Sequence, residues 1–404
     1  MDYLAKLQHF GSRFFGLIIL PAQLPGDPLE VVLDLKDDPV GTIKGWDWSV
    51  VKQLTRQIFT SQKITIPDDP LLERLHKSRS KYLSKGWSAC PLHTSDGIML
   101  DGYIKPPVDG VDVAPRYIIF VGGNSQKYED WLPYFDLYAR DSGLGFLCFN
   151  NRGVARSEGC VTCLDDMLLD LRAAYSHLVD TLGVRTEHIL FHGFSIGAAV
   201  SAAFLSQPGA PKCAITSDRS FRSFCHAAFA IVRGPDAAVG KGAPAASAFP
   251  SGGLSLSTHG VRAVAAATLR STLLAALALL RVVVAQIGVL CFRATGWELN
   301  ALEAWPRIQG PKVLLYNSED NIVNYTAASL HYGLLHAADS TSSEGGDMRS
   351  TREALEQTTV VEVTIRQAQG WALHDCPLSL DTDAWVAMIR AERAALGLGM
   401  ASVS

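Results

Sequence analysis

The chain of 404 residues contains 48% hydrophobic and 19% charged residues, enough apolar material for one large domain with insertions or for two ordinary domains. Its formal net charge is −4. Because nucleic-acid binding needs a clustered basic surface, this balance predicts no nucleic-acid partner.

Residues 1–86 show no alternation of strands and helices and are punctuated by prolines, so we interpret them as an N-terminal extension. The apolar run Phe14–Leu20 follows Lys6 and Arg13, which is the charged-then-apolar order of a signal peptide. The run is short, which favours a helix packed on the surface or touching a membrane, with a targeting signal as the alternative. Apolar residues at helical spacing then predict a short amphipathic helix: Leu71, Leu72, Leu75 and Tyr82.

A regular alternation begins at residue 87. Ala89–His93 and Ile98–Ile104 alternate apolar and polar residues around Ser95-Asp96-Gly97, which predicts a β-hairpin. Short apolar runs follow, each typical of a strand buried on both faces of a parallel sheet: Tyr117–Val121, Gly145–Asn150, His188–His192, Cys213–Thr216, Val313–Tyr316 and Val360–Ile365. Residues 164–182 carry apolar side chains at helical spacing. Together these elements predict an α/β architecture with a mostly parallel sheet.

The alternation is interrupted once, so we expect a core in two parts, residues 87–231 and 301–396, followed by a short tail, 397–404. Residues 337–358 are polar and predict a surface loop within the second part.

The cysteines favour a reducing compartment. Cys148 and Cys213 lie in apolar runs, where cysteine behaves as a small hydrophobic residue. Cys160-x-x-Cys163 has the spacing of a metal or redox site, but no second pair completes it. We therefore expect no bound metal and a cytoplasmic location, together with peripheral contact with a membrane.

The sharpest chemical signal is Gly193-Phe194-Ser195-Ile196-Gly197, which lies between the strand ending at His192 and a run of small residues that begins a helix. In such a strand–turn–helix the serine is held on a tight bend and its hydroxyl projects from the sheet edge. The helix that follows points its N-terminus at the reacting oxygen, which favours negative charge there. An ordinary turn is the alternative, but the context favours Ser195 as a nucleophile.

A serine hydroxyl needs a base, and the base needs an orienting acid. Asp320 follows the strand Val313–Tyr316 and is our candidate acid, with its neighbour Glu319 as the rival. A plain acidic turn residue is the alternative.

The candidate base is His374, which follows the last predicted strand and is the only histidine after position 336. His331 and His336 lie in a predicted helix before that strand, at the wrong end of the topology. Position in the chain therefore favours His374 as the base, with an ordinary surface or core histidine as the alternative.

An oxyanion formed on the substrate would need backbone N–H donors. Ile196, directly after the serine, is one candidate, and Asn124, in the loop after Tyr117–Val121, is the other. Gly122 and Gly123 would let this loop approach the substrate closely, although they fit a simple turn as well.

These motifs, with Asn150–Gly153, Ser157–Gly159 and Ser217–Phe221, resemble the α/β-hydrolase superfamily, nearest to its serine-aminopeptidase-like and membrane-associated acyl-hydrolase branch. The resemblance covers roughly residues 88–230 and 297–395. Gly122 stands where that branch usually has histidine. The resemblance implies an esterase, thioesterase or lipase activity on a small-molecule or acylated substrate, with no cofactor.

Residues 232–300 separate the two parts of the core. Their start, 234–260, is rich in Gly, Ala, Ser and Pro and predicts a linker, whereas 273–292 is apolar enough to suggest a membrane span. One crossing would place Ser195 and His374 on opposite sides of a bilayer, so we interpret the insertion as a hydrophobic cap over an acyl pocket that contacts a membrane surface. A helix merely packed on the core is the alternative.

The sequence thus predicts a mostly parallel α/β-hydrolase sheet flanked by helices, with an inserted hydrophobic cap, and acyl transfer through Ser195, Asp320 and His374. An amidase or peptidase with the same three residues is one alternative. A non-catalytic binding or scaffold protein of the same fold is the other, and the three filled positions speak against it.

Overall fold

The computed structural model describes residues 70–107, 114–124, 126–161, 163–227, 297–320, 322–339, 348–365 and 373–399. The predicted N-terminal helix at Phe14–Leu20 and the apolar segment 273–292 of the cap lie outside these residues. Of the helices that are described, none is long and apolar enough to cross a membrane.

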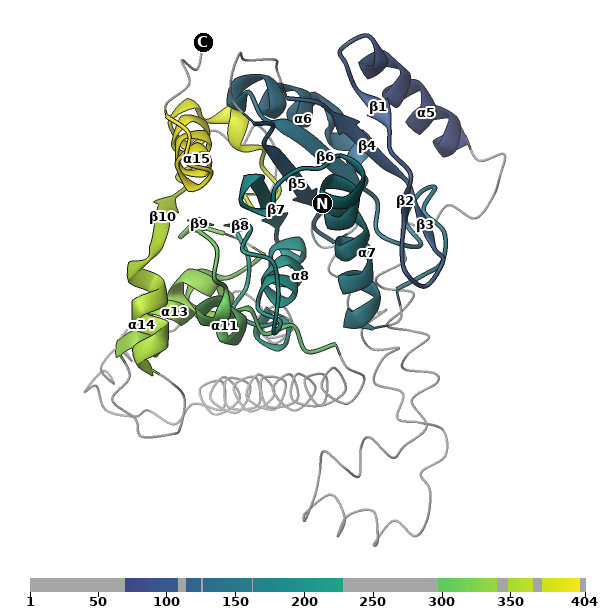
Figure 1. Ribbon diagram of the computed structural model, residues 1–404. Coiled ribbons are helices and arrows are strands. Elements are labelled where there is room, and N and C mark those ends of the chain that lie inside the picture. The colour runs from purple at the N-terminus through teal and green to yellow at the C-terminus, as the bar shows by residue number, and fades with distance from the viewer. Residues whose placement is uncertain are drawn as a thin grey trace, which may run out of the picture.

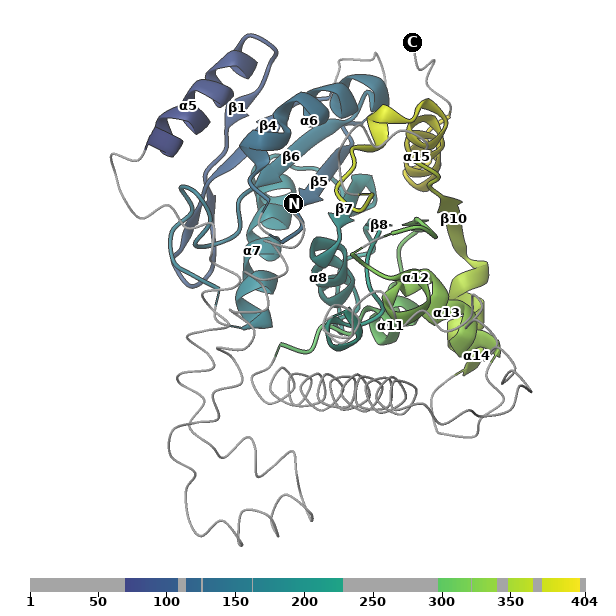
Figure 2. The same ribbon diagram turned by 180° about the vertical axis from the view of Figure 1, so that it is seen from behind.

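The centre of the molecule is a large mixed sheet, as Figures 1 and 2 show. Within the described residues it contains eight strands in the order β1-β4-β6-β5-β7-β8-β9-β10. The strands are β1 (Ser88–Ala89), β4 (Gly102–Lys105), β5 (Tyr117–Val121), β6 (Gly145–Phe149), β7 (Ile189–Phe194), β8 (Ala214–Asp218), β9 (Lys312–Tyr316) and β10 (Thr358–Glu362). All neighbours from β6 to β10 pair in parallel, whereas β4 pairs antiparallel with both of its neighbours, β1 and β6. The predicted mostly parallel sheet is therefore confirmed.

The predicted hairpin is present but divided into two ladders. β1 pairs with β4, while β2 (Leu92–His93) pairs with β3 (Met99–Leu100) as a separate two-stranded sheet. Thr94 closes the turn, since its Oγ1 accepts a hydrogen bond of 2.9 Å from the backbone N–H of Ile98.

Helices cover both faces of the sheet. In chain order they are α5 (Pro70–Leu83), α6 (Tyr128–Ser142), α7 (Leu164–Ser176), α8 (Ile196–Leu205), α11 (Ala301–Ala304), α12 (Tyr325–Ala328), α13 (Leu330–Asp339), α14 (Met348–Glu356) and α15 (Thr382–Ala395). One apolar core lies between the sheet and α7, α8, α11, α13 and α14, and a second lies between the sheet and α6 and α15. Neighbouring strand residues alternate between the two cores, with Ile119 in the first and Ile118 in the second, because side chains of a strand point to opposite faces.

The predicted amphipathic helix near the end of the extension is α5. It lies against α6, and its Leu75 is only 1% exposed. The proposed division into extension, two-part core, insertion and tail stays a prediction.

Two sequence expectations about the second half are wrong. Residues 348–356, predicted as part of a surface loop, form α14, whose Ala354 is buried against the first core. The segment is mostly polar, and polar composition alone does not distinguish an exposed helix from a surface loop. The last strand was expected to be buried on both faces, but β10 lies at the sheet edge and leaves Val360 38% exposed.

Candidate active site

The parallel strands bring the candidate site residues to one edge of the sheet, where the loops after β5, β7, β8 and β9 meet. This is the edge at which α/β sheets bind their ligands. Ser195 lies after β7 and Asp320 after β9, so two distant parts of the sequence converge there.

Ser195 occupies a strained turn between β7 and α8. Its φ is +54° and its ψ is −119°, a conformation that side chains other than glycine rarely adopt. Both flanking glycines are required by close backbone contacts. A Cβ on Gly193 would lie 2.3 Å from the Cα of Ala198, and one on Gly197 would lie 2.1 Å from the carbonyl oxygen of Val121. The turn therefore has the geometry expected of a nucleophile elbow.

The backbone of this turn is held from β8. The N–H of Ser195 donates to the carbonyl of Asp218 at 2.9 Å, and the Oγ of Ser220 donates to the carbonyl of Ser195 at 2.8 Å. Hydrogen bonds thus fix the peptide units before and after the Cα of Ser195.

Asp320 and His374 contact each other directly, although 54 positions separate them. Nδ1 of His374 lies 2.7 Å from Oδ2 of Asp320, and both side chains are almost fully buried. With the proton on Nδ1, His374 donates to the carboxylate and its Nε2 is the basic nitrogen.

The carboxylate is fixed as well as buried. Oδ1 of Asp320 accepts hydrogen bonds from the backbone N–H groups of Ile322 and Val323, both at 2.8 Å. The rival Glu319 is exposed, and only its backbone N–H takes part in the turn, with Asn317. Of the two neighbours, the structure thus brings Asp320 to the histidine.

The candidate base His374 lies beside the turn that carries Ser195. The ring of His374 packs on the ring of Phe194, with centroids 5.1 Å apart, and Phe194 directly precedes Ser195. His374 is therefore held between the acid on one side and the residue before the serine on the other.

The loop after β5 lies against the start of α8, as the contact of Gly197 with the carbonyls of Val121 and Gly122 requires. Ile196 is the first residue of α8, where helical N–H groups have no partner within the helix. Asn124 lies on an exposed turn of the facing loop. The two candidate oxyanion donors are thus placed on adjacent segments.

Sequence reasoning missed Gln126. Its Oε1 accepts a hydrogen bond of 2.8 Å from the N–H of Gly123, so that N–H is engaged within the loop. The polar residue three positions after a glycine pair is a weak signal for this turn.

It also missed a buried set of charges behind the site, made of His192, Asp218, Arg219 and Glu392. Burial alone would lower the pKa of His192, but the carboxylates of Glu392 and Asp218 raise it to about 9. The sequence gives only a weak signal for this buried set. Asp218 and Arg219 stand at the end of an apolar strand, and Glu392 lies within the apolar face of α15.

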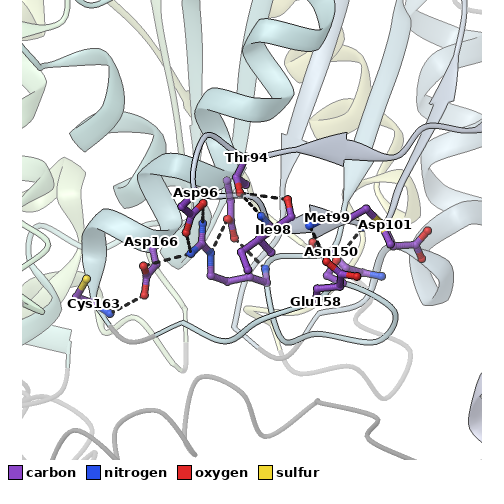
Figure 3. A network of polar contacts seen from close by, with 12 residues as sticks. Thr94, Asp96, Ile98, Met99, Asp101, Asn150, Glu158, Cys163 and Asp166 are labelled. Atoms are coloured by element: carbon purple, nitrogen blue, oxygen red, sulfur yellow. Dashed lines mark hydrogen bonds and ion pairs between the residues drawn. The ribbon is translucent and has the colours of Figure 1, made fainter. Parts of the chain in front are cut away.

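A second buried network fixes the loop after β6, which the sequence singled out only by resemblance. Arg152 reaches Asp96 of the hairpin turn at 2.8 Å, and Asp166 and Asp170 of α7 at 3.2 and 2.8 Å. Figure 3 shows Asp96 of the hairpin facing Asp166 of α7 across this network. Glu158 at the far end of the loop accepts a hydrogen bond of 3.0 Å from the N–H of Met99.

Cys160 and Cys163 are both half-buried and carry free thiols. Across the residues that the structure describes, no group of three or more His, Cys, Asp or Glu side chains is arranged to hold a metal ion.

The chain belongs to the α/β-hydrolase family, since residues 118–358, more than half of its length, match the model of the alpha/beta hydrolase family. This membership supports a hydrolytic enzyme. No curated protein matches the sequence.

Among solved structures, the fold is similar to an esterase of Pyrococcus furiosus, with 16% identity over 77% of this chain and 92% of that one and a TM-score of 0.45. An alpha-beta hydrolase of Vibrio vulnificus has 14% identity over 94% and 98% of the two chains, with a TM-score of 0.46. A puromycin-hydrolyzing peptidase of Mycobacterium tuberculosis has 14% identity over 78% of this chain and 40% of its own, with a TM-score of 0.46.

Proposed function

We propose that this protein is a serine hydrolase that cleaves an ester or thioester of an apolar acyl group. Ser195 is the nucleophile, His374 the general base and Asp320 the acid that orients it. The observation that carries the proposal is the 2.7 Å contact between His374 and Asp320, on a histidine packed against the residue before a strained serine.

The reaction proceeds in two acyl transfers. Oγ of Ser195 attacks the carbonyl carbon while Nε2 of His374 takes its proton, and the imidazolium then protonates the leaving alcohol or thiol. Water repeats the sequence on the acyl-enzyme and releases the acid. Asp320 keeps its charge throughout and stabilises the imidazolium.

The oxyanion of each tetrahedral intermediate is held by the N–H groups of Ile196 and Asn124. The start of α8 supports this role because a helix N-terminus favours negative charge, and because the loop of Asn124 lies against it.

The apolar part of the proposal rests on the sequence of the insertion. We propose that residues 232–300 cover the acyl group and touch a membrane surface from the cytoplasmic side. A single span through 273–292 is disfavoured, because Ser195 precedes the insertion and His374 follows it, yet both lie at one sheet edge.

The proposal is tested by turnover of p-nitrophenyl esters of increasing chain length and of matched anilides. We expect Ser195→Ala to lose turnover, whereas Ser206→Ala, at the other end of α8, keeps it. Faster release from anilides than from esters would replace the esterase by an amidase or peptidase. No turnover of either series by the wild type would favour a non-catalytic binding or scaffold protein of the same fold.

A further inference from the structure

We propose that Arg219 is a positioning residue for the general base: its guanidinium ties the loop that carries His374 to the end of β8. This inference rests on the proposed function, in which His374 must meet Ser195.

Arg219 holds the histidine loop on both sides of the base. Its Nη1 donates to the carbonyl of Cys376 at 2.7 Å and, more weakly, to that of Leu373 at 3.4 Å. Because these two carbonyls flank His374, the guanidinium limits both displacement and rotation of the segment that carries the imidazole.

The same side chain also contacts Phe194, the aromatic residue that packs on the imidazole of His374. The guanidinium carbon lies 4.9 Å from the ring centroid of Phe194, whose ring in turn packs on that of His374. Arg219 thus contacts both the backbone on either side of His374 and the ring of Phe194. Arg219 is itself only 4% exposed.

Arg219 is held in place by its neighbour. Nε and Nη2 contact the two carboxylate oxygens of Asp218 at 2.7 and 2.9 Å, which is the bidentate arrangement of an arginine fork. The backbone of Arg219 has a φ of +48°, and this unusual conformation lets a residue at the end of β8 turn its side chain back toward the carboxylate before it.

The contacts of Asp218 continue into the core through His192 and Glu392. Oδ2 of Asp218 lies 3.7 Å from Nε2 of His192, whose Nδ1 lies 2.7 Å from Oε1 of Glu392. The hydroxyl of Tyr138 donates to the same glutamate. Burial would raise the pKa of Asp218, but Arg219 and His192 hold it below its ordinary range, so the carboxylate stays charged and keeps the fork in place.

A lysine cannot replace this arginine. Lysine would keep the positive charge, but its single ammonium group lacks the planar fork that serves one carboxylate on one side and two carbonyls on the other. We therefore expect Arg219→Lys to preserve the charge balance of the core and to release the histidine loop.

The test is the rate at which a fluorophosphonate probe reacts with Ser195, because that reaction needs the base but no knowledge of the substrate. For Arg219→Lys we expect the limiting rate kinact to fall about 10²-fold, with KI nearly unchanged, since a displacement of the base by about 1 Å has an effect of this size. In Arg219→Ala, added guanidinium should restore part of the lost rate.

Arg79→Lys is the matched control. Arg79 contacts both carboxylate oxygens of Asp101 at 3.0 and 3.1 Å, and it lies on α5, at the opposite edge of the sheet from α15. We expect this variant to lose thermal stability and to keep kinact. If Arg219→Lys does not fold, Asp218→Asn gives the same test with a smaller loss, because it weakens the fork and leaves the guanidinium in place.

A wild-type kinact in Arg219→Lys, or an equal loss in Arg79→Lys, would overturn the positioning role. Failure of the proposed function gives a different result: the wild type would not react with the probe, or Ser195→Ala would react equally well.

Discussion

The two buried arginines Arg152 and Arg219 illustrate two uses of one side chain. Arg152 contacts side-chain carboxylates that come from the hairpin and from α7: Asp96, Asp166 and Asp170. Arg219 contacts one carboxylate and, with its remaining N–H groups, the backbone carbonyls of Leu373 and Cys376.

The difference lies in what each arginine fixes. Carboxylates on several elements make Arg152 a stabiliser of packing between the hairpin, the loop after β6 and α7. Carbonyls on a single loop make Arg219 a determinant of that loop's geometry. We therefore expect changes near His374 to reduce the rate of reaction, and changes near Arg152 to reduce the free energy of unfolding.

The largest effect is expected at the acid. Asp320→Asn leaves the shape of the site but favours the wrong tautomer of His374 and removes the counter-charge, so kcat should fall about 10⁴-fold. Steady-state kinetics on a hydrolysed ester measures this loss. Glu319→Gln is the matched control and should change kcat little, because the Glu319 side chain is exposed; a reversed order of the two effects would assign the acid to Glu319.

Arg152→Met tests whether Arg152 stabilises the packing of the hairpin, the loop after β6 and α7. It leaves the carboxylate of Asp170, which is fully buried, without its cation, and breaking a buried pair in this way costs about 3–5 kcal/mol. Urea denaturation should show this loss, while the folded fraction retains its rate with the fluorophosphonate probe. An unchanged unfolding midpoint would show that Arg152 does not hold these elements together.

Glu129, beside the same loop, makes stability depend on pH. The residue is 1% exposed; Oε2 accepts a hydrogen bond of 3.0 Å from Asn150, and Oε1 has no partner within the described residues. Burial raises its pKa from 4.5 to about 6. The folded state binds the proton of Glu129 more tightly than the unfolded state does. The free energy of unfolding therefore falls by about 2 kcal/mol in all as the pH rises through the interval between these two pKa values.

Glu129→Gln should remove this dependence. Denaturation of the variant and the wild type should give similar stabilities below pH 4 and a more stable variant at pH 8. Parallel curves over the whole range would mean that Glu129 titrates as an ordinary exposed carboxylate.

The smallest effect concerns the cap. If the insertion covers the acyl chain, each methylene buried there is worth about 0.8 kcal/mol, or about fourfold in kcat/KM. Leu279→Asp should then weaken turnover of long-chain esters, spare acetyl esters and reduce binding to liposomes. An equal loss on short and long esters, with lowered thermal stability, would make the segment ordinary core.

The sheet could be predicted from the sequence because its pattern is local. Tyr117–Val121 was predicted residue for residue, since five consecutive apolar side chains can only be satisfied by burial on both faces. The ends of β10 and the existence of α14 could not be predicted. The edge strand is half-exposed, and α14 is short and mostly polar and packs on α13, which lies outside its own segment of sequence.

The candidate site follows the same rule. Gly193 and Gly197 mark the serine turn because local backbone contacts exclude a side chain there. The position in the chain favoured His374 and left Asp320 and Glu319 as rivals, and the structure brings Asp320 to His374. The partnership of Arg219 with residues about 155 positions away leaves no local trace, and neither does that of His192 with Glu392.

The central claim is that Ser195 is a nucleophile activated by His374. Peptide mass spectrometry after reaction with a fluorophosphonate tests it most directly. We expect a single phosphonyl adduct on the peptide that contains Ser195, formed rapidly in the wild type and far more slowly in His374→Ala. An adduct on another residue, or equal labelling of Ser195 without His374, would contradict the account.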